Sequence, residues 1–274
     1  MADDKAERLR ALHQGPPILV LPNAWDAASA RVFEAAGFPA VATTSAGVAA
    51  ALGYPDGGIV PAREMIEAVA RITRAVSVPV TADIEHGYAT TPDAVAENVL
   101  RVIAAGAVGV NIEDCTPGAS GLEPIELQCR KIATVVRAAT TAGVRVVVNA
   151  RTDVFLRRIG TPAEQLAVGA ARGRAFLDAG ADCVFVPGVT DRETIAALVA
   201  GVGGPINVLA VAGSPPVREL EALGVARVSV GSGPMRAVLG LLQDIARELR
   251  VDGTYKRFTE RQMTYDAVND LMRA

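Results

Sequence analysis

Eight short apolar runs, rich in β-branched residues, recur along the chain and constrain its fold more than any other feature. They are hydrophobic almost throughout instead of alternating, which is typical of strands buried on both faces of a parallel sheet. The runs are Ile18 to Leu21, Ala40 to Thr44, Val78 to Asp83, Val108 to Asp114, Arg145 to Arg151, Cys183 to Pro187, Ile206 to Ala210 and Arg227 to Val230. Helical periodicity separates them, for example in Ala62 to Ala75 and Pro92 to Ala105.

A strand and a helix therefore alternate eight times, which indicates a closed (β/α)₈ TIM barrel of the α/β class. An open doubly wound sheet is disfavoured, because no GxGxxG turn follows the first strand. The 274 residues are predicted to form a single domain, with the barrel over about 16–235. Two further helices, Met235 to Leu249 and Phe258 to Met272, follow within about 236–274. That is one helix more than the barrel needs, so we expect helix swapping between the subunits of a homodimer or homotetramer.

Composition excludes several functions. A formal net charge of −3 offers no basic face for the phosphates of a nucleic acid. Cys115, Cys129 and Cys183 form no metal-binding or disulfide pattern, which favours a reducing cytoplasm. The first 15 residues lack the apolar run of a signal peptide, and no segment is long and apolar enough to predict a membrane helix. We therefore expect a cytoplasmic protein with no nucleic-acid or membrane partner.

Acidic residues close the third and fourth predicted strands. Asp83 and Glu113 end neighbouring strands about 4.8 Å apart, so their carboxylates should converge at the barrel mouth, where such folds place their active sites. Glu85 follows on the third strand, and Arg151 ends the fifth. Clustered oxygen ligands favour a hard ion, Mg²⁺ or alternatively Mn²⁺. The other interpretation is that these acids cap helices or pair with arginines on the rim.

Other candidate residues carry weaker signals. The small-residue turn after the second strand can hold a carboxylate on its free N–H groups, or can serve packing alone. Trp25 can wall the pocket or be a core residue, and Asp56 lies in a turn expected to cross the barrel mouth. Cys115 and His86 follow strand ends and can take part in proton transfer, although a packed thiol and a supporting histidine are the alternatives. The substrate contacts predicted at this rim are Trp25, Thr44, Ser45, Ala46, Gly47, Asp83, Arg151 and Asn207.

Together these segments resemble the isocitrate lyase and phosphoenolpyruvate mutase superfamily over essentially the full chain. The resemblance rests on five segments besides the Asp83-x-Glu85-x-Gly87-Tyr88 stretch, in which Glu85 stands where the family usually has Asp. These are Asn23-Ala24-Trp25-Asp26, Thr44-Ser45-Ala46-Gly47, Gly53-Tyr54-Pro55-Asp56, Asn111-Ile112-Glu113-Asp114 and Asn149-Ala150-Arg151-Thr152-Asp153.

The resemblance implies that Asp83 ligates Mg²⁺ directly, while Asp56, Glu85 and Glu113 hold its waters. It also implies that residues 45–47 and Arg151 bind the substrate's carboxylate. A metal chelated by a 2-oxo acid would stabilise the enolate formed when a bond beside the carbonyl is made or broken. The expected catalytic residues are Arg151, Glu113, Cys115 and His86.

One segment departs from the family. Lyases of this group carry a Lys-Arg/Lys-Cys-Gly-His loop after the Glu-Asp pair and mutases a Lys-Thr-Asn loop, but this chain has neither between Cys115 and Pro124. Cleavage would then need another proton source, such as Cys115, Ser120, His86 or water. The first hypothesis is a Mg²⁺-dependent carbon–carbon lyase acting on a small 2-hydroxy or 2-oxo di- or tricarboxylic acid. The alternatives are a carbon–phosphorus enzyme, and a barrel that binds 2-oxo acids with little catalysis.

Overall fold

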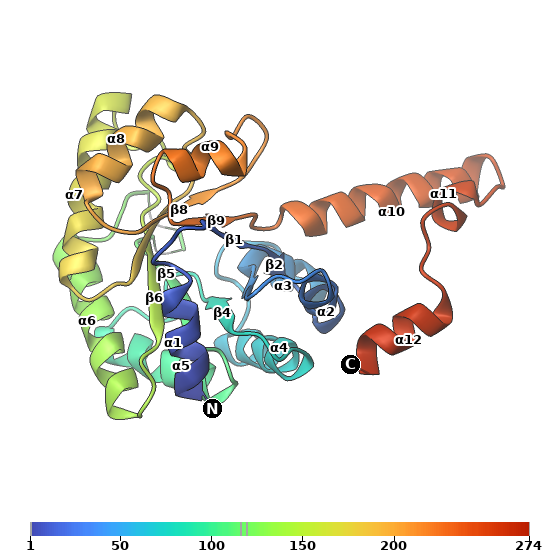
Figure 1. The fold of residues 1–274 in the computed structure, drawn as a ribbon, viewed down its shortest axis with the longest axis horizontal. Coiled ribbons are helices and arrows are strands. Elements are labelled where there is room, and N and C mark those ends of the chain that lie inside the picture. Colours follow the sequence, from blue (N-terminus) through green and yellow to red (C-terminus); the bar gives the residue numbers. More distant parts are fainter. Residues whose placement is uncertain (1, 116, 119, 274) are drawn as a thin grey trace.

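The computed structural model describes residues 2–115, 117–118 and 120–273. Their strands form one parallel sheet in the order β1-β9-β8-β7-β6-β5-β4-β3-β2, and it closes into a barrel because β1 and β2 are consecutive in the chain (Figure 1). The strands are β1 (Leu19–Leu21), β2 (Asn23–Ala24), β3 (Val41–Thr43), β4 (Val80–Asp83), β5 (Gly109–Glu113), β6 (Val147–Arg151), β7 (Cys183–Val186), β8 (Ile206–Leu209) and β9 (Arg227–Ser229). The predicted (β/α)₈ barrel is confirmed.

Helices cover the outside of this barrel, and three more follow the last strand (Figure 1). They are α1 (Ala2–Ala11), α2 (Ala27–Ala35), α3 (Ser45–Leu52), α4 (Ala62–Ala75), α5 (Pro92–Ala104), α6 (Ile125–Thr141), α7 (Pro162–Asp178), α8 (Arg192–Val202), α9 (Val217–Ala222), α10 (Gly233–Val251), α11 (Lys256–Thr259) and α12 (Tyr265–Arg273). Each predicted strand corresponds to one observed strand, and the short β2, directly after the first of them, was not predicted.

Pro22 divides the first strand, because proline has no N–H to donate to a ladder. β1 pairs with β9 and β2 pairs with β3, so the strand changes partner at this point. The Asn23 side chain joins the two sides. Its Oδ1 accepts hydrogen bonds of 2.9 Å from the backbone N–H groups of both Val230 and Gly231, and its Nδ2 donates to the Thr43 carbonyl at 2.8 Å. A single side-chain amide thus closes the barrel at its carboxyl end.

The alternation of side chains along each strand separates the core from the barrel interior. On β5, Val110 and Ile112 are fully buried against Ile132 and Val135 of α6. Asn111 and Glu113, which alternate with them, point to the other side, into the barrel. The outward positions therefore provide the hydrophobic core, and the inward positions at the carboxyl ends remain for polar groups.

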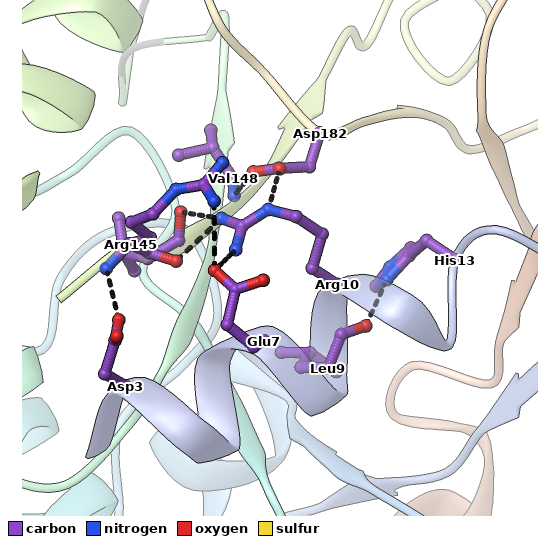
Figure 2. A network of polar contacts seen from close by, with 9 residues as sticks. Asp3, Glu7, Leu9, Arg10, His13, Arg145, Val148 and Asp182 are labelled. Atoms are coloured by element: carbon purple, nitrogen blue, oxygen red, sulfur yellow. Dashed lines mark hydrogen bonds and ion pairs between the residues drawn. The ribbon is translucent and has the colours of Figure 1, made fainter. Parts of the chain in front are cut away.

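Helix α1 covers the amino-terminal end of the barrel and buries Leu9 there completely. Figure 2 shows the polar network that fixes it. Arg10 Nε donates to Asp182 Oδ1 at 2.8 Å, and its Nη2 donates to the Arg145 carbonyl at 2.7 Å. Arg10 and Arg145 also share the Glu7 carboxylate, at 2.9 and 3.1 Å. The amino-terminal segment therefore belongs to the barrel fold.

His13, just beyond α1, predicts how stability should depend on pH. It is buried, and its Nδ1 lies 2.8 Å from the Leu9 carbonyl (Figure 2). Burial, with the Arg227 charge nearby, lowers the pKa of His13 from 6.5 to about 4. Between these values the unfolded chain binds a proton that the native chain does not. We therefore expect His13 to reduce the free energy of unfolding by about 2 kcal/mol between pH 7.5 and pH 5.

Urea unfolding of the wild type and of His13→Gln at both pH values measures this contribution. Glutamine can still donate to the Leu9 carbonyl but does not titrate. Its stability should therefore fall by about 2 kcal/mol less than that of the wild type over this interval. Equal losses in the two proteins would contradict the assignment to His13.

The C-terminal arm, residues 233–273 with α10 to α12, differs from its prediction. Figure 1 shows α10 extending away from the barrel and α12 folding back toward α2, where Arg31 Nε donates to the Leu271 carbonyl at 2.7 Å. The single predicted helix 258–272 is wrong, because α11 and α12 are separate. Thr264 starts the second one, since its Oγ1 accepts a hydrogen bond from the Ala267 N–H at 3.2 Å, as an N-cap does.

Among the described residues, no helix has the length and apolar character needed to cross a membrane.

Candidate functional site

A cavity of about 380 Å³ opens at the carboxyl ends of the strands. Eight of the predicted site residues line it. They lie on strands β3, β4, β5 and β6 or in the segments that follow these strands. These are Thr44, Ser45, Ala46, Asp56, Asp83, Glu85, Glu113 and Arg151. The barrel therefore brings together the four predicted metal-site carboxylates, although they come from segments far apart in the sequence.

Asp83, the last residue of β4, is held rigidly by the neighbouring strand. Its Oδ2 accepts hydrogen bonds from Ser45 N at 3.0 Å and from Ser45 Oγ at 2.8 Å, and its own N–H donates to Thr43 Oγ1 at 2.9 Å. Asp83 Oδ1 is buried and has no partner within the described residues. A buried carboxylate oxygen without a hydrogen-bond partner is rare and costs stability, so this oxygen is a candidate to bind a ligand.

Glu85 occupies a strained turn directly after β4. Glu85 and Tyr88 both have left-handed backbone conformations, with φ of 51° and 53°. Between them Gly87 has φ of 88°, and a Cβ there would lie 2.6 Å from a Val95 methyl carbon. Tyr88 donates its hydroxyl to Glu85 Oε1 at 3.1 Å. Such strain persists where the surroundings fix a conformation, and here it turns the Glu85 carboxylate toward the cavity.

Glu113 and Arg151 end adjacent strands in register and form an ion pair. Arg151 Nη1 lies 2.9 Å from Glu113 Oε2, while its Nε and Nη2 donate to the two Asp153 oxygens at 2.6 and 3.0 Å. The guanidinium also lies over the Phe185 ring, 5.8 Å from its centroid. Two carboxylates thus orient Arg151 at the cavity wall and neutralise much of its charge.

Electrostatics in the cavity favour a cation. Burial, and then the Asp83 charge, raise the pKa of Glu85 to about 7. Burial raises the pKa of Glu113 as well, with repulsion from Asp153 and Asp83 adding to the effect and Arg151 opposing it. Carboxylates that repel one another in this way are stabilised by a positive ion between them.

The described side chains do not, however, form a ready set of metal ligands. No three His, Cys, Asp or Glu residues among them are grouped closely enough to hold an ion. Mg²⁺ needs few direct protein ligands, because it keeps several of its waters and commonly binds through one or two carboxylates. Asp83, with one anchored oxygen and one without a partner, suits such a ligand, and Glu85 and Glu113 suit the water positions. The residues present therefore fit a largely hydrated Mg²⁺.

The turn after the second barrel strand starts α3. Thr44 is the N-cap, and its Oγ1 accepts from Gly47 N at 3.4 Å. Ser45 N donates to Asp83, so two of the backbone N–H groups expected to hold a substrate already have partners inside the protein. A Cβ on Gly47 would lie 2.9 Å from Trp25 Cβ, which shows that close packing needs the glycine. Ser45 and Ala46 line the cavity, whereas Gly47 supports it from behind.

Four other predicted residues also lie outside the cavity lining. Trp25 lines a separate groove together with Val48, Leu52 and Met272 of the C-terminal arm. Cys115 is buried, and burial raises the pKa of its thiol to about 12. His86 is also buried, and burial and the Lys131 charge lower its pKa. Asn207 lies in the barrel interior and donates to Ser229 Oγ at 3.0 Å.

The cavity also contains residues to which the sequence pattern assigned no role. Asn23, Asn111, Asp153 and Ser229 contribute polar groups, and Arg157 adds a second guanidinium. A further group, Leu156, Phe185, Pro187 and Leu209, adds apolar surface. Asn111 and Ser229 carried a usable signal, since each is a polar residue inside an otherwise apolar strand. Thr116 and Ala119, in the loop that departs from the family, lie outside the described residues.

Comparison with known proteins gives consistent matches. The family model described as phosphoenolpyruvate phosphomutase matches residues 9–250. An uncharacterized protein of Mycobacterium tuberculosis (strain ATCC 25618 / H37Rv) is 40% identical over 235 residues, which cover 86% of this chain and 85% of the relative. An oxaloacetate decarboxylase of Rhodopseudomonas palustris (strain BisB5) is 30% identical over 262 residues, 92% of this chain and 86% of the relative.

A solved structure agrees with the same fold. The crystal structure of a phosphonopyruvate hydrolase complex with oxalate and Mg²⁺ matches with a TM-score of 0.86 at 25% identity, covering 97% of this chain and 94% of that one. The oxaloacetate decarboxylase and the phosphonopyruvate hydrolase are named for different substrates, so the shared fold alone does not identify a substrate for this chain.

Proposed function

Because the chain belongs to the phosphoenolpyruvate phosphomutase family, within the isocitrate lyase and phosphoenolpyruvate mutase superfamily, we propose that it is a Mg²⁺-dependent carbon–carbon lyase. Its substrate is a small 2-oxo or 2-hydroxy di- or tricarboxylic acid, and one product is a 2-oxo acid. The observation that carries the proposal is Asp83, anchored through one oxygen and buried without a partner at the other, facing a cavity that Glu85 and Glu113 share.

Each residue has a role that follows from its position. When bound, Mg²⁺ would polarise the substrate carbonyl and stabilise negative charge on its oxygen. Asp83 would hold the ion, and Asp56, Glu85 and Glu113 would orient its waters. Arg151, fixed by Glu113 and Asp153, directs its guanidinium toward the substrate carboxylate. The Ser45 hydroxyl lies at the same wall and keeps Asp83 oriented. Cys115, His86 and Ser120 lie outside the cavity lining, so the proton required by the enolate product comes from water.

The charge of the cavity favours carboxylate substrates over phosphonates. Five acidic residues line it against two arginines, and Arg151 already pairs with two of the acids. A phosphonate group places more negative charge at one position than a carboxylate group does, so it would be repelled more strongly at that position. The relative named oxaloacetate decarboxylase acts on a carbon–carbon bond, in agreement with this choice.

A substrate panel tests the proposal. Purified protein with Mg²⁺ is incubated with oxaloacetate, isocitrate, 2-methylisocitrate and phosphonopyruvate, and the products are followed by NMR. We expect a 2-oxo acid from at least one carbon–carbon substrate, loss of turnover with EDTA, and no turnover of phosphonopyruvate. Binding of 2-oxo acids without turnover across the panel would instead indicate a metabolite-binding barrel.

The proposed enzyme is a homodimer or homotetramer in which the C-terminal arm docks on a second copy. Leu239, Leu242 and Leu249 of α10 are 46%, 56% and 49% exposed in a single chain. Apolar surface gathered on an extended helix is typical of a protein interface. The swapped arrangement would cover this face with the neighbouring subunit.

Leu242→Glu should therefore weaken subunit association about 100-fold or more, because an unpaired carboxylate would be buried in the interface. Light scattering coupled to gel filtration would show a shift toward the monomer at micromolar concentration. Gln243→Glu adds the same charge one residue away and serves as the matched control. If Leu242→Glu left the mass unchanged while the wild type was oligomeric, the arm would not be the interface.

A further inference from the structure

Arg227 lies deep inside the barrel, below the cavity. It begins β9, opposite Leu19 on one side and Asn207 on the other. Ser229, two residues further along, lines the cavity. Residues two apart on a strand point to the same face, so Arg227 is directed into the barrel about 6.6 Å deeper than Ser229. Its side chain has no exposed surface.

The contacts of Arg227 leave most of its charge uncompensated. Its Nε donates to Ser229 Oγ at 3.2 Å, and the same Oγ accepts from Asn207 Nδ2 at 3.0 Å. Both terminal nitrogens, Nη1 and Nη2, are buried without a hydrogen-bond partner in the described chain. Nor does any carboxylate of those residues lie within ion-pair distance of it. Arginine buried in this way is rare, because it normally has partners.

Such a residue should cost the fold stability. Burial lowers the pKa of Arg227 to about 10, with the Cys183 thiol and the Asp83 carboxylate opposing that change. The guanidinium is nevertheless charged at neutral pH. Burying a charge without a counterion costs solvation that no ion pair offsets, so an apolar residue of similar volume is expected to be neutral or stabilising at this position. A purely structural explanation for Arg227 is therefore weak.

The cavity above it offers a better explanation. Its acidic residues outnumber its arginines by five to two, and Glu113 and Asp153 already engage Arg151. A carboxylic acid that enters such a cavity needs further positive potential, and the interior of a protein transmits that potential with little screening. Arg227 supplies a fixed positive charge on the side of the cavity that solvent cannot reach.

We propose that Arg227 is a positioning residue, whose buried charge below the cavity floor favours binding of the anionic substrate and orients the Ser229 hydroxyl with Asn207. This inference rests on the proposed function, since it assumes an anionic ligand in the cavity. The effects it predicts differ from those of a general loss of structure. Removing the charge should weaken anion binding, strengthen or preserve binding of a divalent cation to the acidic cavity, and leave stability unchanged or improved.

Arg227→Met tests this, with Arg227→Lys as the charge-preserving control. Calorimetry measures binding of Mg²⁺ alone and then of oxalate, a planar dianion, in the presence of Mg²⁺; urea unfolding measures stability. In Arg227→Met we expect oxalate binding to weaken about tenfold, Mg²⁺ affinity to stay equal or rise, and unfolding free energy not to fall. Arg227→Lys should bind oxalate within about threefold of the wild type.

Two outcomes would overturn the inference, and a third would overturn the proposed function on which it rests. Unchanged oxalate affinity in Arg227→Met would show that the charge does not act on the ligand. A parallel loss of Mg²⁺ affinity, oxalate affinity and stability, or failure of this variant to fold, would show that Arg227 is structural. Absence of oxalate binding in the wild type with Mg²⁺ would instead refute the proposed function itself, and the wild-type titration therefore separates the two failures.

Discussion

Replacing Asp83 by alanine is expected to abolish Mg²⁺ binding and to reduce turnover by about a thousandfold or more. The reason is geometric. Ser45 holds one oxygen of this carboxylate with two hydrogen bonds, and the other oxygen is buried and unpartnered. Without the side chain, the cavity loses a carboxylate that has one anchored oxygen and one oxygen free to bind an ion. Calorimetric titration with Mg²⁺ and the assay that reports product should both fail in the same variant.

Asp191→Asn is the matched control for this experiment. Asp191 caps α8 by accepting a hydrogen bond from Thr194 N at 2.8 Å, and it does not line the cavity. This substitution keeps a side-chain oxygen at the N-cap, so it should leave Mg²⁺ affinity and turnover within about twofold of the wild type. Full Mg²⁺ affinity in Asp83→Ala would contradict the metal assignment, even if turnover were lost.

Replacing Arg172 by methionine is expected to destabilise the fold by about 3–5 kcal/mol. Arg172 Nε lies 2.7 Å from Asp114 Oδ2, and the Asp114 side chain is completely buried. The second Asp114 oxygen accepts from Asp153 N at 3.0 Å, while Arg172 Nη2 donates to the Glu123 carbonyl at 2.7 Å. Without Arg172, Asp114 would be a buried charge with no counterion, directly after the end of β5.

Urea unfolding at pH 7 measures this effect. The double variant Arg172→Met/Asp114→Asn should recover more than half of the loss, since the neutral amide no longer needs a cation. Arg174→Met, two residues further along α7, removes an exposed arginine that bonds the Gly201 carbonyl, and should cost less than about 1 kcal/mol. Equal losses in the single and double variants would show that packing, and not charge, explains the result.

The strands and the acidic cavity could be predicted from the sequence for simple physical reasons. Strands buried on both faces read as continuous apolar runs, and the carboxyl end of each strand must lie at the same end of a parallel barrel. Asp83 and Glu113 end such runs, so their meeting required only the right strand order. The register of β5 and β6 then places Arg151 beside Glu113, because the two are paired residues on adjacent strands.

Features that depend on side-chain direction were harder to predict. Cys115 follows Glu113 by two residues, but the strand has ended there, and the thiol is buried instead of facing the cavity. Trp25 lies close to the rim in sequence, yet it packs behind Gly47. Arg227 shares a strand face with Ser229, but the sequence alone does not show which face of that strand turns into the barrel. These side-chain directions depend on how all the strands of the sheet pair around the barrel, which a local sequence pattern does not show.

The way the barrel closes has a consequence for its synthesis. Asn23, from the first strand, lines the cavity and holds the backbone of Val230 and Gly231, which follow the last strand. More than 200 residues separate the two ends of this contact. A nascent chain emerges from the ribosome starting at its amino terminus. The cavity is therefore complete only after nearly all of the barrel has been synthesised. A fragment that ends before Val230 lacks both backbone groups that Asn23 holds, so its cavity is incomplete.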